Sequence, residues 1–545
     1  MTLTRSFWPA DTSESITAVT VGDLLRDAAA TSPELTALLA GRADPAERRS
    51  WNYAELLTEA EQAARALLEH MAPGERIAIV APNVPEWVIL EFGAALAGVV
   101  LVAINPAVSD ADLLDALARS HTAVLFHLAK TGDRDLVAVV RRNRPRLPEL
   151  RETIALSEWT DFVGGADPCR PLPLVSPKAT AAILFTSGTR GTPIGVVMRH
   201  EALVNNAHFA FRRMGLRRGE RLLPAVPICH GSACGFCVLG SLARRATLVL
   251  PEVLDPGPVL ELAETCRAQL VFTLPARLTA MVEDPAAGRR DLSAVRIVVS
   301  AAAPSGPELI RSVGATFGCP VINVYGQTET SAIAVGAPTD GTHAPADAVG
   351  RPLPQAECKI IDSSTGQITD VGTPGELCIR GYQVMSEYLE APAITAKRID
   401  PQGWLHTTDM ATLDECGNIT VTGRLRDVIV QGTERIFPRE IENCLHGHPG
   451  VGDAIVLGVP DGCGDQRIVA VVRPVAGSSA APAELRTHCL RQLGPVRTPT
   501  EWYFVDRLPL TGPGKIKKHA LRESILDGRL KPEPTVVPRR DTGRE

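Results

Sequence analysis

Two long stretches of this chain alternate short apolar runs with helix-like segments, and this alternation restricts the fold more than any other feature. In the first stretch, the runs rich in β-branched residues are 76–82, 98–104 and 122–128. In the second stretch, the corresponding runs are 269–275, 295–304 and 320–326. Such β-α-β alternation is typical of a parallel sheet that helices cover on both faces. The sequence therefore predicts two α/β units in the part of the chain that precedes residue 330.

The pattern changes from about residue 345 onward. Residues 375–384 and 417–430 alternate in the manner of strands between glycine-rich turns, which predicts a smaller β-rich subdomain. After Arg424, residues 438–475 combine one helical segment with two strand-like runs, which is a compact α+β pattern. The last residues, 531–545, are polar and rich in proline, and we expect them to be disordered.

Composition excludes several classes of protein. The net charge of the 545 residues is −6, which argues against a nucleic-acid-binding protein with a basic face. The 12 cysteines are too sparse for a disulfide scaffold and, with no signal-peptide core at the N-terminus, favour a cytoplasmic protein. Residues 87–108 are long and apolar enough to suggest a membrane span, but Glu91, Asn105 and the β-branched second half favour a buried helix followed by a buried strand.

One loop has the chemistry to hold phosphate. The apolar run 181–185 leads into the hydroxyl- and glycine-rich segment Thr186, Ser187, Gly188, Thr189, Arg190, Gly191 and Thr192. Glycines allow backbone N–H groups to turn inward, and hydroxyls add donors, so the segment can form a nest for a polyphosphate. It is not a Walker loop, because the Gly-Lys-Ser/Thr ending is absent. Taken alone, an ordinary Ser/Gly loop between two strands explains it equally well.

Four further motifs follow in order along the chain. They are "NVYGQTET" at 323–330, "GWLHTTDMA" at 403–411, "GRLRDVI" at 423–429 and "PLTGPGKIKKHAL" at 509–521. Together with "TSGTRGTPIGVV", this ordered set resembles the adenylate-forming superfamily, which includes acyl-CoA synthetases, amino-acid adenylation domains and luciferases. The resemblance runs from about Ser50 to about Leu526 and is closest in look to fatty-acyl-CoA ligases.

The resemblance implies a fold and a division into domains. It implies an α/β fold, with a large N-terminal region of two α/β subdomains plus a β-rich subdomain, and a small mobile α+β domain at the C-terminus. The expected boundaries are 1–423 for the AMP-binding domain, 424–427 for the hinge, 428–530 for the C-terminal domain and 531–545 for the tail. Rotation about the hinge near Arg426 would gate the second half-reaction.

The resemblance also implies roles for individual residues around ATP and Mg²⁺. The loop from Thr186 to Gly191 would cradle the β- and γ-phosphates, and Thr186 and Glu329 would hold the metal, which prefers oxygen ligands. The adenine and α-phosphate would be bound by Tyr325, Ala302, Ala303 and Thr328. Asp409 would accept hydrogen bonds from the ribose, supported by Arg424.

Two more side chains have implied catalytic roles. Lys515 would bridge the ribose, the α-phosphate and the acid's carboxylate, and so stabilise charge during attack on phosphorus. His230 matches a position that lines the acyl pocket in relatives, although a satisfied core histidine explains it nearly as well. His230 also lies among Cys229, Cys234 and Cys237, whose spacing allows a zinc site. Because the segment is apolar and lacks a second Cys/His pair, we expect small buried thiols instead.

The sequence departs from the family pattern at several positions. Ile194 occupies the place of the loop lysine, and Arg190 in the same loop offers a replacement charge. Ala301 and Ala302 stand where a glycine turn precedes the adenine, and Thr408 stands where glycine usually precedes Asp409. The hinge residue is Arg426, and Val430 and Thr433 replace a lysine and a glycine beyond it. The last two changes affect thioester formation more than adenylation.

The sequence thus predicts ATP- and Mg²⁺-dependent activation of a small carboxylic acid, with transfer to CoA. Two alternatives stay open. One is the same adenylation with another acceptor, such as a carrier protein, or with nitrite passed to an arylamine as in diazotases. The other is a non-catalytic ATP-binding relative, which Ile194 suggests and Lys515 opposes. The identity of the acid is not predicted, and a homodimer is left open.

Overall fold

The chain folds into two compact units, described here from a computed structural model. The structure describes residues 2–128, 130–131, 134–186, 193–303, 305–338, 348–431, 434–460, 466–475, 477–478, 480–509 and 516–533. The first unit comprises Met1–Lys359, Cys378–Thr407 and Leu413–Thr420. The second unit comprises Ile360–Leu377, Thr408–Thr412 and Val421–Glu545.

A seven-stranded sheet forms one layer of the first unit. Its order is β21 (Glu387–Tyr388), β11 (Gly195–Arg199), β10 (Thr180–Phe185), β5 (Val100–Ala103), β4 (Arg76–Val80), β6 (Thr122–His127) and β9 (Glu152–Ala155). The strands from β10 to β9 are parallel to their neighbours, whereas β11 and β21 are antiparallel. The parallel strands are almost wholly buried, as expected for a sheet covered on both faces.

A nine-stranded sheet forms the second layer of this unit. Its order is β18 (Arg351–Pro352), β17 (Ser331–Val335), β16 (Val321–Gln327), β15 (Ile297–Ala301), β14 (Leu270–Thr273), β12 (Arg221–Pro224), β13 (Thr247–Pro251), β2 (Thr36–Gly41) and β3 (Ser50–Asn52). The six strands from β16 to β2 run parallel, with antiparallel strands at both ends. Ligands of such sheets bind beyond the carboxyl ends of the strands, so the turn after β16 is where a site is expected.

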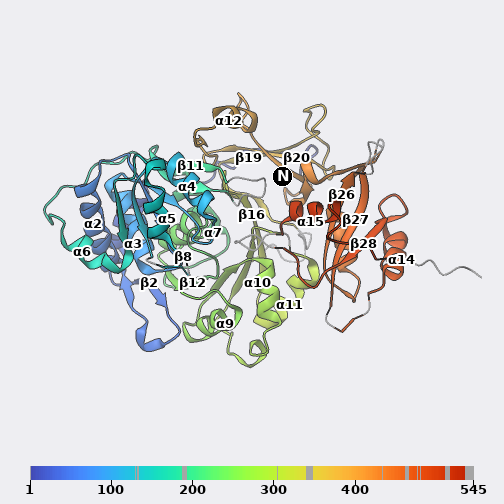
Figure 1. The fold of residues 1–545 in the computed structure, drawn as a ribbon, viewed down its shortest axis with the longest axis horizontal. Coiled ribbons are helices and arrows are strands. Elements are labelled where there is room, and N and C mark those ends of the chain that lie inside the picture. The colour runs from blue at the N-terminus through green and yellow to red at the C-terminus, as the bar shows by residue number, and fades with distance from the viewer. Residues whose placement is uncertain are drawn as a thin grey trace, which may run out of the picture. The chain divides into compact units, whose positions relative to one another are not determined.

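Helices contact both sheets of the first unit. The helices that contact one another and the two sheets are α1 (Val21–Thr31), α2 (Tyr53–His70), α3 (Pro85–Ala97), α7 (His200–Arg213) and α8 (Leu239–Arg244). A second group, α9 (Pro256–Thr265), α10 (Pro275–Val282) and α11 (Pro307–Phe317), is drawn in green beside the nine-stranded sheet in Figure 1. Side chains from this group join a buried apolar cluster with the sheet. The apolar faces of both sheets are therefore covered.

Local sequence explains where these helices begin. Thr20 and Asp23 form a capping box at the start of α1, and Asn52 and Glu55 form another at α2, so the first free N–H groups of each helix are satisfied. Helix α3 begins at Pro85, whose fixed φ suits the first helical position.

The second unit contains a three-stranded sheet of its own. Strand β26 (Val451–Pro460) pairs antiparallel with β27 (Gln466–Pro474), which pairs parallel with β28 (Glu501–Phe504). The helices α13 (Pro438–His446), α14 (Pro482–Leu493) and α15 (Lys518–Leu526) belong to the same unit, and their apolar side chains enter two clusters with the sheet. The hairpin of β24 (Ile429–Gln431) and β25 (Glu434–Ile436) precedes them.

A further sheet has five strands. Its order is β1 (Phe7–Trp8), β19 (Ala356–Ile361), β20 (Gly375–Gly381), β22 (Leu405–Leu413) and β23 (Ile419–Arg424). The short 3-10 helix η7 (Leu425–Asp427) follows β23, where the hinge was expected. The domain boundaries themselves stay a prediction.

The elements expected from the sequence are present. The mixed α/β class is confirmed, and each of the six apolar runs contains a strand of a mainly parallel sheet. The apolar stretch 87–108 holds most of α3 and the buried strand β5, which confirms the expectation of a buried helix followed by a buried strand. Among the described residues, no helix combines the length and apolar character needed to cross a membrane.

Candidate active site

The predicted adenine-side residues lie on two neighbouring strands. Strands β15 and β16 are parallel and in register with Ala301 beside Val324, so the turn at Ala302 and Ala303 follows β15 next to Tyr325 on β16. Ala302 has φ +66°, the left-handed conformation that glycine adopts most easily. Ala302 therefore keeps the backbone conformation expected of a glycine at this turn, although the residue is alanine.

The motif "NVYGQTET" makes a tight reversal at the end of β16. A Cβ on Gly326 would lie 2.0 Å from the carbonyl oxygen of Ser331 on the returning strand β17, so no side chain fits there. The reversal brings Thr328 and Glu329 to the carboxyl end of β16, with Thr328 partly exposed and Glu329 buried. The predicted α-phosphate and metal residues are thus at the edge where ligands of open α/β sheets bind.

Glu329 is held at one of its two carboxylate oxygens. The hydroxyl of Tyr388 donates to Oε1 of Glu329 at 2.6 Å, and the backbone N–H of Met385 donates to the Glu329 carbonyl at 2.8 Å. Burial, followed by the charge of Glu329, raises the pKa of Tyr388 to about 12, so this phenol keeps its proton at neutral pH and stays a donor.

Tyr388 also connects Glu329 with the hairpin of β10 and β11. Tyr388 lies on β21 and is paired with Val196 of β11, the strand that follows the loop 186–194 in the sequence. Sequence reasoning missed this residue. Its contact with Glu329 joins positions 59 residues apart, and no local pattern in a two-residue strand predicts such a pair.

A second residue missed from the sequence is Arg398, the last residue of α12 (Pro392–Arg398). Its Nε donates to the Tyr388 hydroxyl at 3.2 Å, and its Nη2 lies 3.6 Å from Oε1 of Glu329. Nη2 is also 3.5 Å from Oε1 of Gln327. Arg398 is only 6% exposed, which is unusual for an arginine unless the side chain has a role in a site or an ion pair.

The loop expected to hold the phosphates is only partly described. Thr186 ends the strand β10, and its backbone N–H donates to the carbonyl of Ile194 at 3.0 Å. In return, the N–H of Ile194 donates to the Thr186 hydroxyl at 3.1 Å, which closes the base of the loop. The other loop residues, Ser187, Gly188, Thr189, Arg190 and Gly191, lie outside the described residues, and so do Thr433 and Lys515. Their predicted roles stay predictions.

The carboxylate oxygens of Glu329 fit a role as ligands of a magnesium ion. Mg²⁺ takes a small number of carboxylate oxygens together with phosphate oxygens and water. Oε1 of Glu329 is occupied by Tyr388, whereas Oε2 has no hydrogen-bond partner in the described part of the chain. One fixed oxygen and one free oxygen suit a monodentate ligand.

The predicted ribose residues lie in the second unit and pair with each other. Nε of Arg424, at the end of β23, is 3.1 Å from Oδ1 of Asp409, which is 5% exposed on β22. Thr408, where a glycine was expected, has φ +58° and donates its N–H to Oε1 of Glu376 at 3.0 Å. The ribose contact stays a prediction, because the ion pair alone also explains the arrangement.

The chain that carries Lys515 is anchored just beyond it. Lys518, at the start of α15, places its Nζ 3.0 Å from Oε1 of the buried Glu442 on α13. The same oxygen accepts the backbone N–H of Val456 at 3.0 Å. Lys515 lies three positions before Lys518 in the sequence and outside the described residues.

His230 and the three cysteines do not form a described metal site. Nδ1 of His230 lies 2.8 Å from the Ser232 hydroxyl, and Cys234 and Cys237 lie in the π-helix η4 (Ala233–Val238). Burial raises the pKa of the Cys229 thiol to about 12 and those of Cys234 and Cys237 well above their usual value. The burial of all three thiols fits the expectation of small apolar side chains. Among the described residues, none of these four joins a group of three or more potential ligands.

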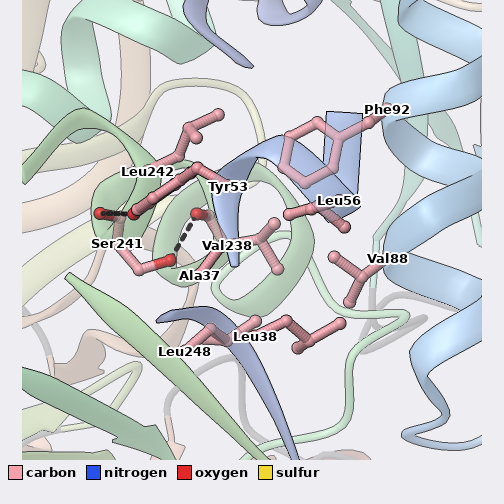
Figure 2. Close-up of a pocket in the computed structure, with 10 residues that line it drawn as sticks. All are labelled: Ala37, Leu38, Tyr53, Leu56, Val88, Phe92, Val238, Ser241, Leu242 and Leu248. Atoms are coloured by element: carbon pink, nitrogen blue, oxygen red, sulfur yellow. Dashed lines mark hydrogen bonds between the residues drawn. The ribbon is translucent and has the colours of Figure 1, made fainter. Parts of the chain in front are cut away.

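A small cavity is separate from all of these residues. It holds about 10 Å³ between α2, α3, α8 and the strands β2 and β13, and Figure 2 shows its lining. The Tyr53 hydroxyl donates to the carbonyls of Ala246 and Ser241 at 2.7 and 3.4 Å beside it. This space is about that of one water probe, too small for an organic acid, and it is therefore not the acyl pocket.

Comparisons with known proteins agree with this architecture. The family described as "AMP-binding enzyme" matches residues 25–389, and the family "AMP-binding enzyme C-terminal domain" matches residues 440–515. The chain is 30% identical over 538 residues to the putative acyl-CoA synthetase YngI of Bacillus subtilis, covering 93% of this chain and 97% of that protein. It is 31% identical over 505 residues to the mitochondrial medium-chain acyl-CoA ligase ACSF2 of Danio rerio, covering 86% and 83%.

A solved structure is similar over nearly the same length. The amide bond synthetase McbA of Marinactinospora thermotolerans is 29% identical and superimposes with a TM-score of 0.81. The similarity covers 92% of this chain and 99% of McbA. The resemblance noted in the sequence is therefore confirmed by both kinds of comparison.

Proposed function

The chain belongs to the AMP-binding enzyme family, and from this membership we propose that it activates a carboxylic acid with ATP and transfers the acyl group to CoA. In the first half-reaction, a carboxylate oxygen of the acid attacks the α-phosphorus of ATP and the bond to the pyrophosphate oxygen breaks. In the second, the CoA sulfur attacks the acyl carbon and AMP leaves, while the thiol proton passes to solvent. The protein is proposed to act in the cytoplasm, although one relative is mitochondrial.

One observation carries the nucleotide part of this proposal. A buried carboxylate, Glu329, lies at the carboxyl end of β16, with Tyr388 donating to one oxygen and the other left for a ligand. Oε2 makes no hydrogen bond with the described residues and, unlike Oε2 of Glu91, is not among the fully buried oxygens without a partner, so it is open to a ligand. The free oxygen supports a role in binding a cation.

The residues of the chain contribute to the reaction by orienting the reacting groups and by stabilising charge. When bound, Mg²⁺ supplies positive charge to the phosphate oxygens. Tyr388 fixes the carboxylate rotamer of Glu329, and Thr328 presents a hydroxyl to the α-phosphate. Lys515 is proposed to align the acid's carboxylate with the α-phosphorus, the kind of contact that is typically worth about 3–4 kcal/mol in a transition state.

Relatives support CoA as the acceptor. Both curated relatives named above are acyl-CoA synthetases or ligases by name, and one of them is a ligase for medium-chain acids. Val430, which replaces the family lysine, is 46% exposed on β24, and its N–H donates to Oε1 of Gln466 at 3.1 Å. The change at Val430 is therefore the reason to test the thioester step separately from adenylation.

A second acceptor class is supported by a different observation. The solved structure at 29% identity is that of an amide bond synthetase, whose name describes an amine as acyl acceptor. An amine acceptor is also what the diazotase-like alternative requires. We propose it as the second candidate, with the same first half-reaction.

A release assay separates these candidates. Purified enzyme with ATP and Mg²⁺ is given short, medium-chain, aromatic and inorganic acids, with CoA, with an aromatic amine, or with neither. We expect pyrophosphate release with a carboxylic acid, and an acyl-CoA detected by mass spectrometry only when CoA is present. Glu329→Gln is the matched variant, because it keeps the volume of the side chain and removes the metal-binding charge.

The outcomes of this assay are distinct. An amide formed in the amine arm without a thioester in the CoA arm favours the second candidate. Splitting of ATP only with nitrite and an arylamine favours the diazotase-like reaction. ATP binding without pyrophosphate release for every acid contradicts both enzyme candidates and leaves a non-catalytic ATP-binding protein.

A further inference from the structure

The guanidinium of Arg398 is buried beside Glu329 with one nitrogen unused. Nε and Nη2 contact Tyr388, Glu329 and Gln327, but Nη1 is buried and has no hydrogen-bond partner in the described part of the chain. A buried donor without a partner costs about 1–3 kcal/mol, and more when the group is charged. An unsatisfied cation of this kind indicates a partner that the protein alone does not supply.

The protein atoms that contact Arg398 are already in use, and Oε2 of Glu329, which the proposed cation would take, makes no hydrogen bond with Nη1. The Tyr388 hydroxyl accepts from Nε, and Oε1 of Glu329 accepts the Tyr388 hydroxyl. Gln327 presents its oxygen to Nη2 and donates its Nε2 to the Thr407 carbonyl at 3.0 Å. None of these atoms accepts from Nη1, and with Oε2 of Glu329 assigned to the cation, we assign the remaining acceptor to a ligand, for which an anionic oxygen is the strongest choice.

The position of Arg398 relates it to Ile194. Val196 is paired with Tyr388 across β11 and β21, and the bonds between Thr186 and Ile194 extend the pairing of β10 and β11 beyond the end of the strand. Because strand side chains alternate, Ile194 and Val196 lie on one face, and the paired Tyr388 lies on that face too. Because Nε of Arg398 donates to the Tyr388 hydroxyl, the guanidinium lies on the same side of the sheet as Ile194, the position that lacks a lysine.

We propose that Arg398 binds the phosphate chain of ATP through Nη1 and supplies the positive charge that Ile194 lacks. The planar guanidinium suits phosphate oxygens better than an ammonium does, and its other two nitrogens are already fixed by protein acceptors. The phosphate chain is preferred to the acid substrate because it carries several negative charges and because Glu329, beside Arg398, is the proposed metal ligand. This inference rests on the proposed function only in naming ATP as the ligand.

Binding measurements test the inference without requiring turnover. The dissociation constants of ATP, pyrophosphate and AMP are measured by calorimetry for the wild type, Arg398→Met and Arg398→Lys. The control is Lys397→Met, which changes the exposed neighbour on the same helix. We expect Arg398→Met to weaken ATP and pyrophosphate binding about 10- to 100-fold, the scale of one charge-assisted hydrogen bond. AMP binding should change less than threefold, and Arg398→Lys should recover part of the loss.

Loss of folding is separated from loss of a phosphate contact by a double variant. Arg398→Met with Glu329→Gln removes both buried charges, so it avoids the uncompensated carboxylate that Arg398→Met leaves. If Arg398→Met melts at a lower temperature, this double variant is compared with Glu329→Gln alone. A further loss of ATP affinity supports the inference, and equal ATP affinities overturn it.

Other outcomes also decide the matter. Equal weakening of ATP and AMP by Arg398→Met means that Arg398 only supports the fold around Glu329, which overturns the inference. Loss of ATP affinity in Arg190→Ala, with none in Arg398→Met, places the replacement charge in the loop instead. Wild-type enzyme that binds ATP but adenylates no acid contradicts the proposed function and leaves the inference intact, whereas wild type that binds no ATP overturns both.

Discussion

The ion pair between Glu442 and Lys518 offers the sharpest test of what stabilises the C-terminal unit. The perturbation is Glu442→Gln, which preserves the size of the side chain and removes its charge. Oε1 of Glu442 lies 3.0 Å from both Nζ of Lys518 and the backbone nitrogen of Val456, and Oε2 lies 3.9 Å from Nη1 of Arg439. The change thus removes a buried anion from between two cations and a backbone donor.

The magnitude follows from burial and from the alternatives left to Lys518. Removing one partner of a buried ion pair typically costs about 3–5 kcal/mol. Here the Lys518 side chain is 30% exposed and has Asp427 at 3.9 Å as a second partner, so part of the loss is recovered. We therefore expect the free energy of unfolding of this unit to fall by about 2–3 kcal/mol. The control is Glu440→Gln on the same helix, whose exposed pair with Arg497 should cost less than about 1 kcal/mol.

The effect should depend on pH with a defined sign. Burial opposes ionisation of Glu442, but Lys518, the Val456 N–H and Arg439 outweigh it and hold its pKa below the usual 4.5. A lowered folded-state pKa gives stability that is present above pH 4.5 and lost as the pH falls through the folded-state value. The gap between wild type and Glu442→Gln should therefore be widest near neutral pH and shrink in acid.

Native-state hydrogen exchange of the Val456 amide reports this unit alone. A protein of two compact units does not unfold in one step, so a global midpoint would mix them. Exchange at Val456 should be roughly 30- to 150-fold faster in Glu442→Gln, the equivalent of about 2–3 kcal/mol. If Glu442→Gln and Glu440→Gln exchange at the same rate at neutral pH, the buried pair contributes nothing and the reasoning is refuted.

Two further predictions concern the motifs of the site. Lys515→Ala should slow adenylate formation by roughly 10²- to 10³-fold, with much smaller loss in transfer from a supplied acyl-adenylate; equal loss in both half-reactions would contradict its role. Thr408→Gly should raise the denaturant midpoint, because a left-handed residue other than glycine costs about 1–2 kcal/mol and glycine returns only about 0.5–1 of that through chain entropy. With φ +58° at Thr408, an unchanged or lower midpoint would mean that its side-chain contacts outweigh the strain.

Much of the fold could be predicted because its signals are local. The runs that became β4, β5, β6, β14, β15 and β16 are apolar and β-branched, and burial on both faces gives such runs their character. The same holds for Glu329, since a motif that directly follows a strand is placed by that strand at the edge of the sheet. The order of residues along the chain and the direction of the strands were enough to predict these strands and the place of Glu329.

The clamp on Glu329 could not be predicted for a physical reason. Tyr388 and Arg398 reach Glu329 from 59 and 69 residues along the chain, through a two-residue strand and a seven-residue helix. Adjacent residues Lys397 and Arg398 look alike in the sequence as a basic pair, yet α12 exposes the first and buries the second. Which of them is buried depends on tertiary packing, and no spacing within seven residues determines it.

The departures from the family pattern have a common physical interpretation. Ala302 and Thr408 keep φ values of +66° and +58°, although neither residue prefers them, so the surrounding structure imposes the turn that glycine would give freely. What the site requires at these positions is a backbone direction, and the residue type is secondary. The same reasoning applies to charge: a phosphate responds to the place and sign of a cation, whichever element carries it. A missing lysine at Ile194 is therefore weak ground for a lost activity when a buried guanidinium with an unused nitrogen stands beside Glu329 on the same side of the sheet.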